Sequence, residues 1–392
     1  MGDVLSAIFP ALDNKDLRIG LERSVKNLAP ASIRALNTWP YLVELAEYVR
    51  KVKEEVLQNI DYYIDKTMKS VERCAGHAYL AKTPDEVKKI VDDIIGDEKK
   101  LIVKAKSMVT EEIQLREHLM AKGHEVYETD LGELLIQLSG GKPMHAIAPA
   151  IHIPKEEAAR LLKKIDPEIR EDMSIEELTA RVRRFLREKF VKADVGISGA
   201  NSIAADTGAV FLISNEGNIR NSTNLPPVLI SITGVEKIMP TIKDAFFQAL
   251  VQSGYAGLYP PTYLSVVAGP SSTADIEYHR VYGVHGAKEM HVILYDGGRM
   301  NALKDEYLWE QLLCLRCGRC QAECPIWDLV GNTWGGKVYG GPMGIGWTAI
   351  VEGIDRAAPL AMLCLGCGKC KEVCPSKIDM PSIIRYLKSR FR

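Results

Sequence analysis

Hydrophobic positions in the first 70 residues recur at helical spacing. Over residues 41–69 the apolar side chains stand three or four positions apart, whereas most other positions are Glu, Lys or Arg. Proline is expected to break this segment at three points, Pro10, Pro30 and Pro40. The pattern favours amphipathic helices packed on the next domain over a helix held free for a partner. Residues 1–70 are therefore predicted to form an N-terminal helical segment.

Residues 71–300 change to short apolar runs that alternate with helical patterns. Helices are expected after the capping residue Thr83, over 110–122 up to Gly123, over the charged stretch 155–189 with a break at Pro167, and over 241–253. Strands are expected at 101–103, 125–129, 146–150, 210–214, 228–233, 264–268 and 290–295. This alternation predicts an α/β domain whose largely parallel sheet is covered on both faces.

Two cysteine runs of identical spacing, C-x2-C-x2-C-x3-C-P, stand fifty positions apart near the end of the chain. In such a run three cysteines bind one [4Fe-4S] cluster and the fourth binds the other cluster. A structural zinc site would use two separated pairs, and a disulfide framework would need a secretory signal, which is not evident. The runs predict two [4Fe-4S] clusters, the first held by Cys314, Cys317, Cys320 and Cys374, the second by Cys364, Cys367, Cys370 and Cys324.

The passage around and between the cysteine runs has helical patterns near 307–313 and 347–354. Residues 301–392 are therefore predicted to form a helical ferredoxin domain, similar to the modules of heterodisulfide reductase and succinate dehydrogenase iron-sulfur subunits. Its aromatic residues are expected to shield the clusters from water (Trp327, Trp334, Tyr339 and Trp347). Four basic residues are expected to favour the reduced clusters and to suit an acidic partner, unless they are ordinary exposed loop charges (Arg316, Arg319, Lys369 and Lys371).

Composition narrows the possible partners and compartment. The 392 residues carry a net charge of −1, which argues against a nucleic-acid partner. No apolar run approaches the roughly 20 residues of a membrane span. Cluster thiols must stay reduced until metal arrives, so a cytoplasmic location is expected. The ninth cysteine, Cys74, is expected to be a packed side chain.

A series of short motifs runs from about residue 70 onward. Among them are VKAKSMVTEEI at 103–113, YETDLGE at 127–133 and GPSSTADIE at 269–277, with others at 149–152, 199–201, 206–208, 215–218, 225–227, 234–237 and 283–286. With the cysteine runs, these motifs resemble the family of lactate-utilisation iron-sulfur subunits (protein B), whose N-terminal region is an LUD domain. Departures from the family's usual pattern are Asp206, Ile219 and Ser272, and the family's C-terminal extension does not follow the second run.

The resemblance implies an isomerase- and CoA-transferase-like LUD domain over residues 71–300. It also implies an electron-transfer subunit of a cytoplasmic oxidoreductase complex that oxidises L-lactate, or a similar 2-hydroxy acid, to pyruvate. The implied partners are a cysteine-rich subunit of the heterodisulfide-reductase type and a second LUD protein. Two alternatives stay open: a scaffold or electron-transfer subunit of a heterodisulfide-reductase-like or electron-bifurcating complex, and an enzyme whose own LUD cleft acts on a small acid or thioester.

Polar residues of the middle domain form a possible ligand site. Lys104, Lys106 and Ser107 follow a short strand and open a helix, where an anion could bind. A second polar group punctuated by glycine could bind a small anion, or could be plain turn chemistry (Asn201, Asp206, Thr207, Asn215, Glu216, Asn218 and Arg220). The stretch at 196–200 lacks the third glycine of a dinucleotide fingerprint. The scattered histidines have no metal-binding spacing (His145, His152, His285 and His291).

Overall fold

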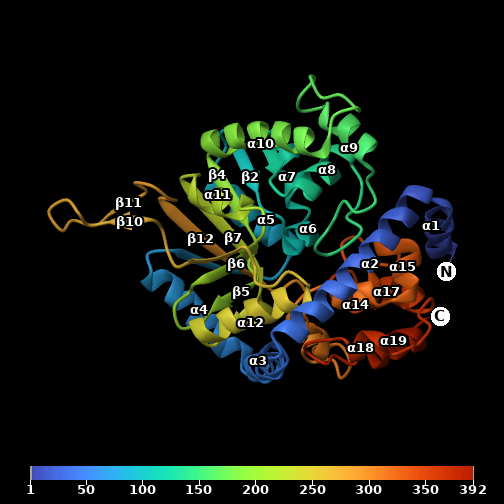
Figure 1. The fold of residues 1–392 in the computed structure, drawn as a ribbon. Helices are drawn as coiled ribbons and strands as arrows, with labels where there is room; N and C mark the ends of the chain where they lie inside the picture. Colours follow the sequence, from blue (N-terminus) through green and yellow to red (C-terminus); the bar gives the residue numbers. More distant parts are fainter. Residues whose placement is uncertain (1, 392) are drawn as a thin grey trace.

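The computed structural model describes residues 2–391 and begins with four helices (Figure 1). These are α1 (Gly2–Asp13), α2 (Lys15–Thr38), α3 (Tyr41–Gln58) and α4 (Ile60–Arg73). The expected breaks at Pro10 and Pro30 were wrong, because both prolines lie inside helices. Helix α2 continues because packing against α12, α14 and α15 outweighs the one hydrogen bond that Pro30 cannot donate. Pro40 does separate α2 from α3.

A six-stranded parallel sheet forms the centre of the molecule, as predicted. Its strands, in spatial order, are β1 (His77–Ala81), β12 (Glu289–Tyr295), β7 (Val228–Gly234), β4 (Val195–Ser198), β2 (Leu101–Lys104) and β3 (Glu125–Glu128). Every neighbouring pair is parallel. All four residues of β4 are buried, as expected for a central strand covered on both faces.

Helices from the intervening segments cover this sheet. They are α5 (Pro84–Ile95), α6 (Met108–Ile113), α7 (Leu115–Ala121), α8 (Leu131–Ser139), α9 (Lys155–Leu162), α10 (Ile175–Lys192) and α11 (Asn218–Asn224). Thr83 caps α5 as expected, its hydroxyl accepting from the Glu86 N–H. The single helix expected over 110–122 is two helices, because Gln114 adopts a left-handed conformation between them.

The strand expected at 146–150 was wrong. This stretch forms turns, in which the Met144 N–H donates to the Pro149 carbonyl. The chain therefore pairs with itself over a short distance and does not join the sheet. Pro149 lies within this stretch and cannot donate a ladder hydrogen bond, which also disfavours a strand here.

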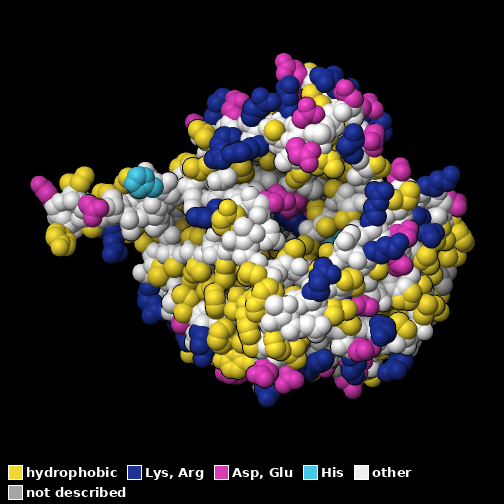
Figure 2. Space-filling view, in the orientation of Figure 1, with side chains coloured by type: hydrophobic (Ala, Val, Ile, Leu, Met, Phe, Trp, Pro, Cys, Tyr) yellow, Lys and Arg dark blue, Asp and Glu magenta, His cyan; other side chains and the backbone are white. Residues whose placement is uncertain are grey.

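A second sheet that the pattern did not predict packs beside the first. Its order is β8 (Ile238–Met239), β5 (Ser202–Ala204), β6 (Val210–Ser214) and β9 (Tyr263–Val267). A 3-10 turn η1 (Val235–Lys237) joins β7 to β8, and α12 (Ile242–Tyr255) covers the sheet and contacts α2 and α3. The strands β10 (Ser272–Thr273) and β11 (Val281–Tyr282) form an arm that projects from the body (Figures 1 and 2).

The remaining chain folds into short helices, as predicted. They are α13 (Arg299–Ala302), η2 (Trp309–Leu313), α14 (Arg319–Ala322), α15 (Pro325–Val330), η3 (Gly331–Thr333), α16 (Gly341–Val351), α17 (Ile354–Ala361), α18 (Lys369–Glu372) and α19 (Met380–Ser389). The expected aromatic residues Trp327, Trp334, Tyr339 and Trp347 are almost fully buried and share one core with cysteines of both runs. Helices α1 and α2 pack on this region too, so they connect both parts of the molecule. Within residues 2–391 no helix is long and apolar enough to cross a membrane.

Candidate iron-sulfur centres and an adjoining cleft

The cysteines of the first predicted ligand set lie together, with Cys317 buried and the other three half-buried. Burial raises the pKa of the Cys317 thiol to about 12, and its neighbours Cys374 and Cys314 contribute to that increase. Burial also raises the pKa of Cys320, again with contributions from the other three members of the set. Tyr255 of α12 lies against this group, since Cys317 and Cys374 add to the burial that raises its pKa to about 12. The first set therefore faces the α/β domain.

The second predicted set surrounds a small cavity. Cys324, Cys364, Cys367 and Cys370 all line this space of about 70 Å³. Burial raises the pKa of Cys370 to about 12, with contributions from Cys364, Cys324 and Cys367. Cys367 is exposed, and the neighbouring Leu365 side chain is 68% exposed. This set therefore opens at the molecular surface.

The eight thiols fit two cubanes better than single metal ions. All nine cysteines are free of disulfides. Within residues 2–391, no three Cys, His, Asp or Glu side chains stand close enough to hold one ion. A cubane instead binds one thiolate at each of four iron corners, so its ligands surround a cluster. Buried thiols at raised pKa are poor thiolates by themselves, and binding to iron supplies the compensating positive charge.

The two sets are close neighbours. Cys370 of the second set contributes to the raised pKa of Cys320 in the first. Each run contributes its fourth cysteine to the environment of the other run, since Cys374 affects Cys317 and Cys364 affects Cys324. This arrangement supports the crossed ligand assignment, which stays a prediction for each cysteine.

A buried ion network joins the first cysteine loop to the α/β domain. Arg316 Nη1 lies 2.7 Å from Glu236 Oε1, and Arg299 Nε lies 2.5 Å from Glu236 Oε2. Arg299 also pairs with Glu112 at 2.8 Å, and the Tyr339 hydroxyl donates to the same carboxylate. Burial alone would raise the pKa of Glu236, but Arg299 and Arg316 hold it well below its usual range. The network fixes the loop of the first set against β7.

A cleft of about 340 Å³ lies where the parallel strands end. Its walls come from the segments after β2, β3, β4 and β7, the place where open α/β sheets bind ligands. On the side shown in Figure 2, the surface is hollowed between the lobe that carries α8 to α10 and helices α2 and α12. Two lysines line the cleft, and each Nζ donates to one backbone carbonyl at 2.5 Å: Lys106 to Ile147 and Lys237 to Ala200.

The structure brings six of the ten predicted ligand-site residues into this cleft. They are Lys106, Ser107, Asn201, Asn215, Glu216 and Asn218. Burial and then Asp130 raise the pKa of Glu216 to about 7, and both carboxyl groups line the cleft. The asparagines are largely occupied within the fold, for example Asn201 Oδ1, which accepts from the Ile213 N–H at 2.9 Å.

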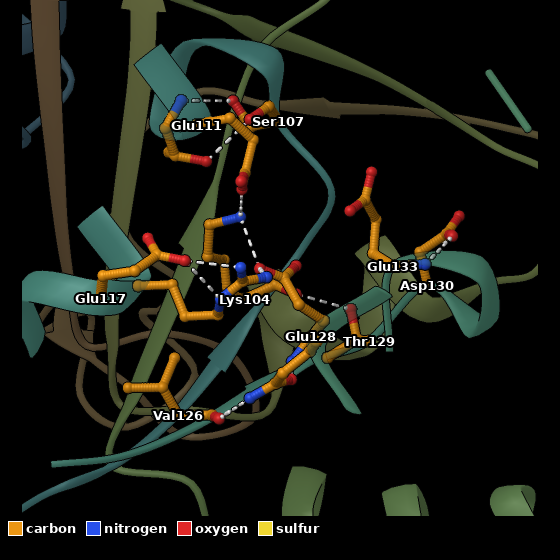
Figure 3. A network of polar contacts seen from close by, with 12 residues as sticks. Lys104, Ser107, Glu111, Glu117, Val126, Glu128, Thr129, Asp130 and Glu133 are labelled. Carbon is orange, nitrogen blue, oxygen red and sulfur yellow. Dashed lines mark hydrogen bonds and ion pairs between the residues drawn. The ribbon is translucent and has the colours of Figure 1, made fainter. Parts of the chain in front are cut away.

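Lys104 lies outside the cleft. Its ammonium group is fully buried, 2.9 Å from Glu111 Oε1 and 2.8 Å from Glu128 Oε1 (Figure 3). Burial would lower the pKa of Lys104, but these two carboxylates raise it instead. Its partners leave no role in an anion site, so the expectation for Lys104 is corrected to a buried structural ion pair.

Other singled-out residues also lie elsewhere. Asp206 and Thr207 face α4 and the start of α12, where the Asp206 carboxylate accepts from the Ile242 N–H. The guanidinium of Arg220 stacks on Tyr263. Among the basic residues near the clusters, Arg316 and Arg319 are buried and ion-paired, so they cannot meet a partner's surface, whereas Lys369 and Lys371 are about half exposed.

Two basic residues of the cleft were missed from sequence. Lys237 stands three residues after the end of β7, and Arg316 stands inside the first cysteine run. The position of Lys237 after a parallel strand was the available signal. No signal placed Arg316 there, because it enters the cleft from a different domain.

Comparisons with known proteins identify both parts of the chain. The LUD domain family matches residues 64–295, and the 4Fe-4S dicluster domain matches residues 310–378. Lactate utilization protein B of Bacillus subtilis is 35% identical over 88% of this chain and 70% of its own length. The protein of the same name from Shouchella clausii is 34% identical over 85% of this chain and 68% of its own length.

A crystal structure of a DUF162 family protein from Deinococcus radiodurans covers 61% of this chain and 98% of its own chain. Its identity is 11% and its TM-score is 0.33, too low to support a structural argument. The dicluster match and the eight cysteines establish two [4Fe-4S] clusters as the cofactors. The chain belongs to the lactate utilization protein B family, with an LUD domain followed by a 4Fe-4S dicluster domain.

Proposed function

We propose that this protein is the iron-sulfur electron-transfer subunit of a cytoplasmic complex that oxidises L-lactate, or a similar 2-hydroxy acid, to pyruvate. The observation that carries the proposal is the unequal setting of the two cysteine sets. The first set has no exposed member and lies beside the LUD domain, whereas the second set includes Cys367, which is exposed at the surface. The name of the related Bacillus subtilis protein, lactate utilization protein B, supports lactate as the substrate that is oxidised.

The positions of the two cysteine sets suit a short electron-transfer path with an inner and an outer cluster. A [4Fe-4S] cluster passes one electron at a time, so two neighbouring clusters divide a two-electron oxidation into single steps. The inner cluster lies next to the LUD cleft, and the outer cluster lies where another protein can approach. Leu365 at the outer opening is an exposed apolar contact of the kind found at interface centres.

Charge at the outer opening favours an acidic partner surface. Residues 362–391 contain six basic residues (Lys369, Lys371, Lys377, Arg385, Lys388 and Arg390) and two acidic ones (Glu372 and Asp379). Complementary charge steers association between proteins and raises its rate. The proposed partners are a cysteine-rich subunit of the heterodisulfide-reductase type and a second LUD protein.

The proposal is tested on protein purified without oxygen from its native source. We expect about eight iron and eight sulfide per chain, co-purifying subunits in mass spectrometry, and L-lactate-dependent reduction of the clusters in the complex by EPR. The isolated chain should not turn over L-lactate with an artificial acceptor. Turnover by the isolated chain would contradict the proposed role, and so would clusters that L-lactate leaves oxidised in the intact complex.

A further inference from the structure

The cleft between the LUD domain and the first cysteine loop has the features of a binding site. Arg316 lines the cleft, its side chain is only 4% exposed, and its guanidinium stacks on Trp347 at 4.0 Å. Its Nε and Nη2 donors have no hydrogen-bond partner among residues 2–391. Buried donors without partners are costly, and a guanidinium matches a carboxylate geometrically. These free donors therefore indicate a missing acceptor.

The backbone of Arg316 also indicates a function for its side chain. Arg316 is in the left-handed region, with φ of 57°, where a residue other than glycine is strained. The second run has Gly366, with φ of 72°, at the matching position between its first two cysteines. Cluster ligation alone therefore does not require arginine in this loop. The arginine persists at a strained position because its side chain ties the loop to Glu236 and reaches the cleft.

In the described part of the chain, two lysines of the cleft lack an ion-pair partner, although two carboxyl groups line the same space. Glu236 balances Arg316 from outside the cleft, whereas neither Lys106 nor Lys237 has a carboxylate partner within the described residues. Burial is the main cause that lowers the pKa of Lys237 to about 7, and Arg316 adds to it. Asp130 and Glu216 also line the cleft, where they offer acceptors for a hydroxyl group and disfavour a multiply charged phosphate.

We propose that the cleft binds a small monocarboxylate with an oxygen on its second carbon, with Arg316, Lys106 and Lys237 around the carboxylate. This inference rests on the proposed function and deepens it, because it places the 2-hydroxy acid, or its 2-oxo product, in this chain beside the first cluster. The cleft volume of about 340 Å³ accommodates a molecule of this size. Arg316 connects the cleft to the first cluster, since its neighbours Cys314 and Cys317 are predicted ligands of that cluster.

The test is anaerobic calorimetry on the cluster-loaded full chain with clusters oxidised, so that electron transfer plays no part. The probes are L-lactate, glycolate and pyruvate, with lactamide as the uncharged match of lactate. We expect at least one acid to bind and lactamide to bind at least 10-fold more weakly. Lys106→Gln and Lys237→Gln should each weaken acid binding by about 10- to 100-fold. The control Lys163→Gln, an exposed lysine on another surface, should leave binding unchanged.

Arg316→Gly copies the second loop and separates two roles of this residue. We expect it to keep both clusters, by iron content and EPR, and to lose acid binding. Acid binding that survives in Arg316→Gly while the EPR signal of one cluster changes would overturn the proposal, since the free donors would then serve the cluster. Absence of binding by all three acids, or equal binding of lactamide, would also overturn it. L-lactate that binds while the native complex fails to reduce its clusters would instead contradict only the electron-transfer role.

Discussion

Arg316 and Glu236 form a buried ion pair of 2.7 Å between the first cysteine loop and the LUD domain. Glu236 also accepts from Arg299, and the Lys53 ammonium donates to its backbone carbonyl. The side chains of Glu236, Arg299 and Arg316 are all buried. The pair makes the position of the first loop depend on a residue eighty positions earlier in the chain.

Glu236→Gln should therefore destabilise the cluster-loaded protein. The substitution leaves Arg316 and Arg299 buried without a full counter-charge, which costs about 3–5 kcal/mol. Denaturant unfolding followed by circular dichroism, together with iron release, measures the effect. The matched control Glu188→Gln removes an exposed carboxylate that pairs with Lys192 and should unfold like the natural protein. Equal stability of the two variants would contradict the importance of the network.

Crossed ligation predicts which cysteine variants resemble one another. Cys374→Ser should remove the same EPR signal as Cys317→Ser, although Cys374 belongs to the second run. Cys324→Ser should match Cys367→Ser in the same way. Each variant should lose roughly half of the iron. Cys74→Ser, whose thiol donates to the Thr207 carbonyl at 3.4 Å, is the control and should keep both signals. A match of Cys374→Ser with Cys367→Ser would mean that each run holds its own cluster.

The basic residues around the outer opening should control the rate of electron delivery. The double variant Lys369→Glu and Arg385→Glu should slow reduction of an acidic ferredoxin by about 10- to 100-fold at low ionic strength. The difference should shrink as salt screens the charges. Stopped-flow absorbance measures the rate. The control Lys163→Glu and Lys192→Glu changes the same net charge on another surface, and a similar slowing there would show a general charge effect only.

Glu133 on α8 predicts a pH dependence of stability. Burial and then Glu128 raise its pKa to about 8, and its Oε2 has no partner within the described chain. Figure 3 shows it apart from the ion pairs of Lys104. Because its folded pKa lies above the unfolded value, its contribution is fully present below about pH 4.5 and is lost as the pH rises through about 8.

Glu133→Gln should therefore flatten the decrease in thermal stability between pH 5 and about 9, an effect on the order of a few kcal/mol. Melting curves across this range measure it. Glu157→Gln, which removes an exposed carboxylate of α9, is the control and should keep the slope of the natural protein. An unchanged slope in Glu133→Gln would assign the pH dependence to other groups.

The cluster chemistry and the central sheet could be predicted from sequence because both are encoded locally. Cysteine spacing within ten residues specifies cluster ligation, and buried parallel strands are continuous apolar runs. Two strands of the second sheet were missed because β5 and β8 have three and two residues, too few for a period to appear. Likewise, β4 was not predicted because Gly196 interrupts its apolar run. Glycine is needed there because the Ser222 backbone approaches too closely for a side chain.

The ligand site was harder to predict because a shift of one or two positions decides whether a side chain enters the cleft. Lys104 is the last residue of β2, where the register pairs it with Glu128 of β3. Lys106 lies beyond the strand end and enters the cleft. In the sequence, Lys104 and Lys106 are equivalent lysines two positions apart. Only the pairing of the strands shows that one is buried in an ion pair and the other enters the cleft. The position of Arg316 in the cleft depends on contacts between the two domains, and no local sequence pattern predicts such contacts.

Helix α2 contacts α12 of the LUD domain on one side and α14 and α15 of the cluster domain on the other. It is synthesised before the segment that carries the cysteines, on which part of its packing depends. That side of the helix therefore stays uncovered until the later segment has been made and has folded. Until then that side is open to chaperones and proteases, which gives the cell a means to recognise chains that have not received iron.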